Sequence, residues 1–137
     1  MKIVINSIVL IIAIVVGMII NMLIVKYGVL LISNPEGYDN TSMEAMQNTF
    51  HLLQPKHYVI PWLAHAFGAF TGALIVFNFS KSNMFYLALS VCVLFFIGGV
   101  IMVVALPSPI WFTVLDLGFA YLPMAWLVKK QFNFRRV

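Results

Sequence analysis

Four apolar stretches dominate the chain, and each has about the length that a helix needs to cross a bilayer, roughly 20 residues. They cover residues 3–25, 58–79, 83–106 and 110–128. The connections at 80–82 and 107–109 are so short that the helices they join must run antiparallel. The pattern therefore predicts an all-α fold, in which residues 1–137 form a single transmembrane domain built as an up-down four-helix bundle.

The long connection at residues 34–57 has a different pattern. Thr41 and Glu44 have the spacing of a capping box, which predicts a helix that is capped by Thr41 and ends near Leu53, before Pro55. Its apolar face carries Met43, Met46, Phe50 and Leu53. Its polar face carries Glu44, Gln47, Asn48 and His51. We expect a short amphipathic helix that lies on the outer surface of the membrane.

Composition and charge support a membrane protein and indicate its orientation. The chain is 63% hydrophobic and only 9% charged, whereas about a quarter of the residues of a soluble domain are charged. Placing both termini in the cytoplasm puts these basic residues inside: Lys2, Lys81, Lys129, Lys130, Arg135 and Arg136. Only Lys26 and Lys56 then lie outside, as the positive-inside rule favours. Because the positive charges lie at span ends, the net charge of +4 does not indicate a nucleic-acid partner.

Two ionisable residues lie within the apolar spans, His65 in the second and Asp116 in the fourth. Both are about 10 Å from the outer end of their span at the rise of an α-helix. Asn21 and Thr113 lie in the outer halves of the first and fourth spans, so we expect an intramembrane polar cluster of these four residues. Ionisable groups in lipid are costly unless they face protein or water.

The His65–Asp116 pair has two interpretations. As a functional pair it could carry a proton, bind a cation or hold a polar headgroup, because histidine titrates near neutral pH and a neighbouring carboxylate favours its charged form. As a structural pair it would be an interhelical hydrogen bond that fixes the register of the second and fourth spans, which contributes about 0.6 kcal/mol on average.

Small residues predict where the helices approach one another closely. The second span carries Ala64, Gly68 and Gly72 at intervals of four, and His65 shares that face. The other helix-packing positions are Gly17 in the first span and Gly98 and Gly99 in the third. In the fourth span, Pro123 predicts a kink near Phe119.

Residues that could carry catalysis or hold a metal are few. Cys92 is the single cysteine, which excludes a two-cysteine redox mechanism and a cysteine-based metal site. Glu44 and His51 are two helical turns apart, which is longer than the usual spacing of metal ligands on one helix. We therefore expect no catalytic residues, no metal, no cofactor and no enzymatic activity.

Three segments carry a resemblance to known proteins: residues 61–68 (PWLAHAFG), 111–116 (WFTVLD) and 121–126 (YLPMAW). Across the last three spans the chain resembles a group of small four-span inner-membrane proteins of Bacteroidota-type bacteria. The resemblance implies a multi-pass protein of the bacterial inner membrane. It implies no activity, because none is assigned to the group.

Three functions remain open. The first is a non-enzymatic accessory or structural subunit, whose partners are the lipid bilayer and either further copies of itself or a larger membrane complex. The second is a small oligomeric transporter or channel for protons or cations that uses His65 and Asp116. The third is a membrane enzyme that acts on lipid at the outer leaflet through His51, His57 or Glu44.

Overall fold

The structure, a computed structural model, describes residues 1–134. It is all-helical over these residues, with no strand among them, as the hydrophobic pattern predicts. Four helical segments are long and apolar enough to cross a membrane: Lys2–Gly28, Pro55–Phe79, Met84–Ala105 and Ile110–Asn133. Arg135 and Arg136, two of the basic residues expected in the cytoplasm, lie outside the described residues.

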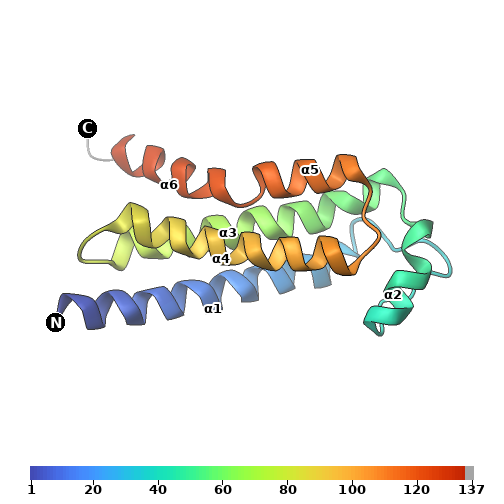
Figure 1. The fold of residues 1–137 in the computed structure, drawn as a ribbon, viewed down its shortest axis with the longest axis horizontal. Helices are drawn as coiled ribbons and strands as arrows, with labels where there is room; N and C mark the ends of the chain where they lie inside the picture. Colours follow the sequence, from blue (N-terminus) through green and yellow to red (C-terminus); the bar gives the residue numbers. More distant parts are fainter. Residues whose placement is uncertain (135–137) are drawn as a thin grey trace.

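The long helices run alternately up and down (Figure 1). They are α1 (Lys2–Gly28), α3 (Val59–Phe79), α4 (Met84–Ala105) and the pair α5 (Ile110–Phe119) and α6 (Leu122–Phe134). The connection between α1 and α3 contains α2 (Met43–Thr49) and two 3-10 turns, η1 (Phe50–Leu52) and η2 (Pro55–Tyr58). The N-terminus, the α3–α4 connection and the end of α6 lie at one end of the bundle, and α2 lies at the other (Figure 1).

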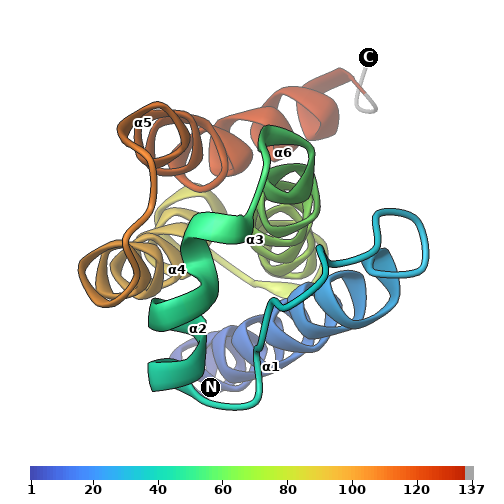
Figure 2. The ribbon, with the colours of Figure 1, turned by 90° about the vertical axis from the view of Figure 1, so that its right-hand side faces the viewer.

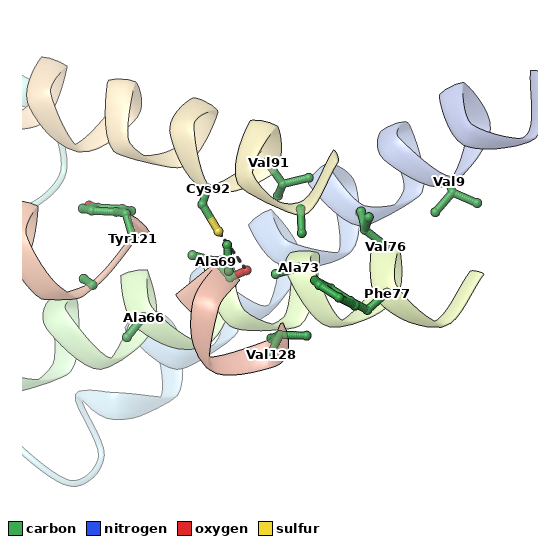
Figure 3. Close-up of a cluster of buried hydrophobic side chains, with 14 residues drawn as sticks. Val9, Ala66, Ala69, Ala73, Val76, Phe77, Val91, Cys92, Tyr121 and Val128 are labelled. Carbon is green, nitrogen blue, oxygen red and sulfur yellow. Dashed lines mark hydrogen bonds between the residues drawn. The ribbon is translucent and has the colours of Figure 1, made fainter. Parts of the chain in front are cut away.

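Helix α3 is the central helix of the bundle, with α1, α4 and α6 around it (Figure 2). Many of its core positions are small: Ala64, Ala69 and Ala73 are fully buried. Small side chains let neighbouring helices approach closely, which is how helices pack in lipid, where burial of apolar surface contributes little. Val91 and Cys92 of α4 complete this core (Figure 3).

The fourth span is interrupted at Ala120 and Tyr121, where α5 ends and α6 has not begun. The amide of Ala120 still donates to the Asp116 carbonyl, at 2.9 Å. Pro123 has no amide proton, and its ring would clash with the carbonyl of Phe119 in a continuous helix. The predicted kink is therefore a full break between two helices, located one to two residues beyond Phe119.

The predicted cap of α2 is wrong by one residue. Ser42, and not Thr41, occupies the N-cap, and its hydroxyl accepts a hydrogen bond from the Ala45 amide at 3.0 Å. The helix continues through η1 to Leu52, one residue before the predicted end. Gln47, on the predicted polar face, donates from Nε2 to the Ala105 carbonyl at 2.6 Å, which ties α2 to the end of α4.

The predicted apolar face of α2 is buried unevenly. Phe50 is buried and packs edge-on against Tyr58, with ring centroids 5.9 Å apart. Met46 is half-buried, and Met43 is exposed. The segment is therefore held to the end of the bundle mainly through Phe50 and Gln47.

A second polar contact fixes the opposite end of the bundle. Asn6 of α1 donates from Nδ2 to the Ser82 hydroxyl at 3.1 Å and accepts from the Lys81 amide at 3.0 Å. These bonds join the first turns of α1 to the connection between α3 and α4. The role of Asn6 was not predicted from the sequence, since a single amide near a span end has no distinctive pattern.

Candidate functional site

His65 of α3 and Asp116 of α5 form a hydrogen-bonded pair. The distances from His65 Nδ1 to the two carboxylate oxygens of Asp116 are 2.8 and 3.0 Å. The Asp116 side chain is only 2% exposed, whereas that of His65 is 22% exposed. The carboxylate is therefore enclosed, and the imidazole is the member of the pair that reaches a surface.

Tyr121 is the third member of the site. Its hydroxyl donates to Asp116 Oδ2 at 3.1 Å. Its ring stacks on the His65 ring, with centroids 5.5 Å apart and planes at 26°. Tyr121 was not predicted as a site residue from the sequence. The available signal was Pro123, because the break that it causes turns Tyr121 toward Asp116.

The hydrogen bonds define the role of each atom. Asp116 accepts from Tyr121, and when Asp116 is ionised it can only accept, so Nδ1 of His65 is then the donor of the second hydrogen bond. The other ring nitrogen, Nε2, has no hydrogen-bond partner within residues 1–134. The carboxylate therefore orients the imidazole and leaves Nε2 for another partner.

An open cleft of about 410 Å³ lies between α1 and α4, and His65 and Tyr121 line it. From α1 it is lined by Ile14, Met18 and Asn21. From α4 it is lined by Leu94, Phe95, Gly98, Gly99 and Met102. Asp116 is not part of the lining. The cleft is thus mainly apolar, and its polar groups come from three side chains.

The predicted four-residue polar cluster is only partly assembled. His65 and Asp116 are bonded to each other, and Asn21 lies in the cleft that His65 lines. Thr113, by contrast, does not line the cleft, and its side chain makes no hydrogen bond within the described part of the chain. Thr113 is therefore not part of the site in this structure.

The predicted small-residue positions lie where α1 and α3 approach most closely. A Cβ added to Gly17 would be 2.7 Å from the Gly68 carbonyl oxygen, and one added to Gly68 would be 2.9 Å from that of Gly17. A Cβ at Gly72 would meet Val91 at 2.8 Å. Real Cβ atoms do not approach so closely, so these contacts require glycine. Ala64 is fully buried on the same helix.

Gly98 and Gly99 have different environments although they are adjacent. A Cβ at Gly99 would lie 2.5 Å from the Tyr121 hydroxyl oxygen, so Gly99 makes room for the ring that contacts Asp116. A Cβ at Gly98 would meet nothing within 4 Å. Gly98 therefore leaves part of the cleft empty and makes no close helix contact there.

The polar residues at the α2 end do not form a common site. Glu44 and His51 are exposed, and His57 is buried. His57 Nδ1 accepts from the Gln54 amide at 2.8 Å, so its role is to cap η2. Within residues 1–134, no group of three histidine, cysteine, aspartate or glutamate side chains could hold a metal ion.

The site can therefore hold α3 against the broken fourth span through Asp116, and the second ring nitrogen of His65, a side chain that lines an apolar cleft, has no hydrogen-bond partner within residues 1–134. Comparison of the chain with protein-family models, with curated proteins and with solved structures gave no match.

Proposed function

We propose that the protein spans the bacterial inner membrane four times, with both termini in the cytoplasm, and acts as a non-enzymatic accessory subunit of a larger membrane complex. Basic residues support this orientation: Lys2 begins α1, Lys81 lies in the α3–α4 connection, and Lys129 and Lys130 lie in the second half of α6. The start of α1, this connection and the end of α6 share one end of the bundle (Figure 1). Glu36, Asp39 and Glu44 lie in the connection at the other end.

One observation carries the subunit proposal: the buried carboxylate is satisfied within the bundle. Asp116 accepts from His65 and from Tyr121, so α3, α5 and the break that follows α5 share one polar contact. Such a contact fixes the register of helices in lipid. A transport pathway, in contrast, needs its ionisable group to exchange protons or ions with water, and Asp116 is enclosed.

The distribution of apolar surface also supports a subunit. Helix α1 is the most apolar of the four spans in the described residues, yet only 17% of its most apolar part is buried, against 44% for the span that contains α3. Helix α1 therefore presents most of its side chains outward, to lipid or to another protein. The connection with α2 is the main part of the described chain outside the spans, which leaves little room for a separate catalytic site.

A second function is favoured by a specific observation. His65 is 22% exposed and lines the cleft, so a proton or cation could reach Nε2 if further copies of the chain closed over the cleft and formed a water-filled pathway. This supports the small oligomeric transporter in which His65 and Asp116 act together. An oligomer would be required, because four helices rarely enclose a pathway.

The test is purification of the native protein in a gentle detergent, followed by native mass determination and mass spectrometry of the same sample. The subunit proposal predicts a complex of fixed stoichiometry with a larger membrane protein. A homogeneous monomer or homo-oligomer with no other protein would contradict it and favour the transporter.

A further inference from the structure

We infer that the cleft between α1 and α4 binds a membrane-dissolved alcohol: a molecule with an apolar body and one hydroxyl group that hydrogen-bonds to His65 Nε2. This inference does not depend on the subunit proposal, because it concerns a small ligand and not a protein partner.

The size and lining of the cleft fit a small apolar molecule. Its volume of about 410 Å³ is within the range of about 300–1,000 Å³ typical of small-molecule sites. Such sites are mostly apolar with a few placed polar groups. Here Met18, Phe95 and Met102 supply apolar surface. The polar groups come from His65, Asn21 and Tyr121.

The position of the opening selects a ligand that is dissolved in the membrane. Met18 of α1 and Leu94 of α4 line the cleft and are 60% and 47% exposed, so the cleft opens on the side of the bundle between these helices. Both residues lie well inside helices that are long and apolar enough to cross a membrane. A bundle inserted by these spans would open this cleft to lipid and not to water.

The hydrogen-bonding state of His65 selects a hydroxyl. Nδ1 is occupied by the Asp116 carboxylate, so only Nε2 remains for a ligand. A neutral ring that donates from Nδ1 has a bare lone pair on Nε2, which accepts from a hydroxyl; a doubly protonated ring donates from Nε2 to the same hydroxyl oxygen. A hydroxyl therefore suits both forms, and the amide of Asn21 adds a donor and an acceptor in the same cleft.

Two glycines provide a matched test of where the ligand lies. A Cβ at Gly98 meets nothing within 4 Å, and Gly98 lines the cleft, so Gly98→Leu would fill the cleft without displacing protein atoms near its Cβ. A Cβ at Gly118 of α5 also meets nothing within 4 Å, but Gly118 does not line the cleft. Gly118→Leu is therefore the control for an added leucine on an open helix face.

A substitution of His65 separates the role of Nδ1, which contacts Asp116, from that of Nε2, which would contact the ligand. Asparagine is shorter, so His65→Asn places an amide N–H near the position of Nδ1, where it can still donate to Asp116. It has no atom at the position of Nε2. The variant would keep the contact between α3 and α5 and remove the ligand contact.

The experiment uses the purified full chain in lipid nanodiscs and a hexadecanol that carries a photoreactive diazirine on its chain. The matched probe is the corresponding hexadecane without the hydroxyl. Mass spectrometry of peptides locates the labelled residues. Competition with unlabelled isoprenoid alcohol or with diacylglycerol distinguishes a free alcohol from a lipid as the source of the hydroxyl.

We expect the alcohol probe to label cleft residues such as Met18 or Met102 at least fivefold more than the hydrocarbon probe does. Gly98→Leu and His65→Asn should each remove that excess, and Gly118→Leu should retain it. Equal labelling by both probes would overturn the inference and show a groove for lipid chains. Unchanged labelling in Gly98→Leu, or cleft residues cross-linked to a second copy of the chain, would also overturn it.

Discussion

The side chains of Asp116 and Tyr121 are hydrogen-bonded at 3.1 Å although they are five residues apart in the same span. On a continuous α-helix, positions five apart point about 140° away from each other. Because the helix is broken at Ala120 and Tyr121, this angle does not apply, and the tyrosine side chain lies close to the carboxylate. The buried carboxyl group of Asp116 thus obtains a second hydrogen bond because the helix is interrupted.

Gly99→Ala tests this arrangement, with Gly98→Ala as its control. The Cβ at position 99 would lie 2.5 Å from the Tyr121 hydroxyl oxygen, so the ring must move from Asp116. We expect Gly99→Ala to lower the free energy of unfolding by about 1–3 kcal/mol, the usual cost of overpacking. Gly98→Ala should change it by less than about 0.5 kcal/mol. Unfolding in mild detergent measures both, and equal effects of the two would contradict the assigned role of Gly99.

Gly17→Ala tests the close approach of α1 to α3. Its Cβ would meet the Gly68 carbonyl oxygen at 2.7 Å, and a backbone atom cannot rotate away as a flexible side chain can. We expect the variant to lose about 1–3 kcal/mol of unfolding free energy. A disulfide between cysteines introduced on facing positions of α1 and α3 should also form more slowly in the Gly17→Ala variant than in the protein with Gly17. Wild-type stability would mean that the two helices are not packed this closely.

The spans could be predicted from the sequence because apolar length alone defines them. The cap of α2 and the membership of the site depend on contacts between residues, and these cannot be read from the local sequence. Thr41 and Ser42 both have cap chemistry, and only the backbone conformation of Ser42 decides between them. Tyr121 could not be predicted as a site residue because helical periodicity places it away from Asp116. That periodicity does not hold at the break between α5 and α6. Thr113 satisfied the same periodicity and yet has no part in the site.

The pairing of His65 with Asp116, in contrast, could be expected from depth. The two residues lie at about the same depth from the outer ends of their spans. In the structure, His65 Nδ1 is 2.8 Å from Asp116 Oδ1. The cleft beside them could not be predicted, because it depends on how far α1 and α4 stand apart.

Asp116→Asn distinguishes a structural pair from a transport pair. In liposomes with an internal pH indicator, we expect the wild-type protein to carry no proton or cation flux above that of protein-free liposomes. The nearly isosteric variant should behave in the same way, because the carboxylate is enclosed and bonded to neighbours. A wild-type flux that Asp116→Asn abolishes would establish the transporter and refute the subunit proposal.

The connection before α2 should be sensitive to acid. Hydrogen bonds from the side chain and backbone of Thr41 lower the pKa of Asp39 below 3.8. Because the folded pKa is the lower one, this contribution to local order is present above pH 3.8 and is lost as the pH falls through the folded pKa. We expect Thr41→Val to raise the pKa of Asp39 toward 3.8. A carboxyl titration followed by NMR measures this shift, and an identical titration curve in the variant would show that the hydroxyl has no role.

A double-mutant cycle on His65 and Asp116 tests the central claim, that this pair holds α3 to the fourth span. Unfolding free energies are needed for His65→Ala, Asp116→Ala and the double variant, measured in one detergent or bilayer system. If the pair holds α3 in place, the double variant should lose less stability than the sum of the two single variants, by about 0.6–1.7 kcal/mol. Additive losses, within about 0.3 kcal/mol, would mean that the two side chains do not stabilise the fold through each other.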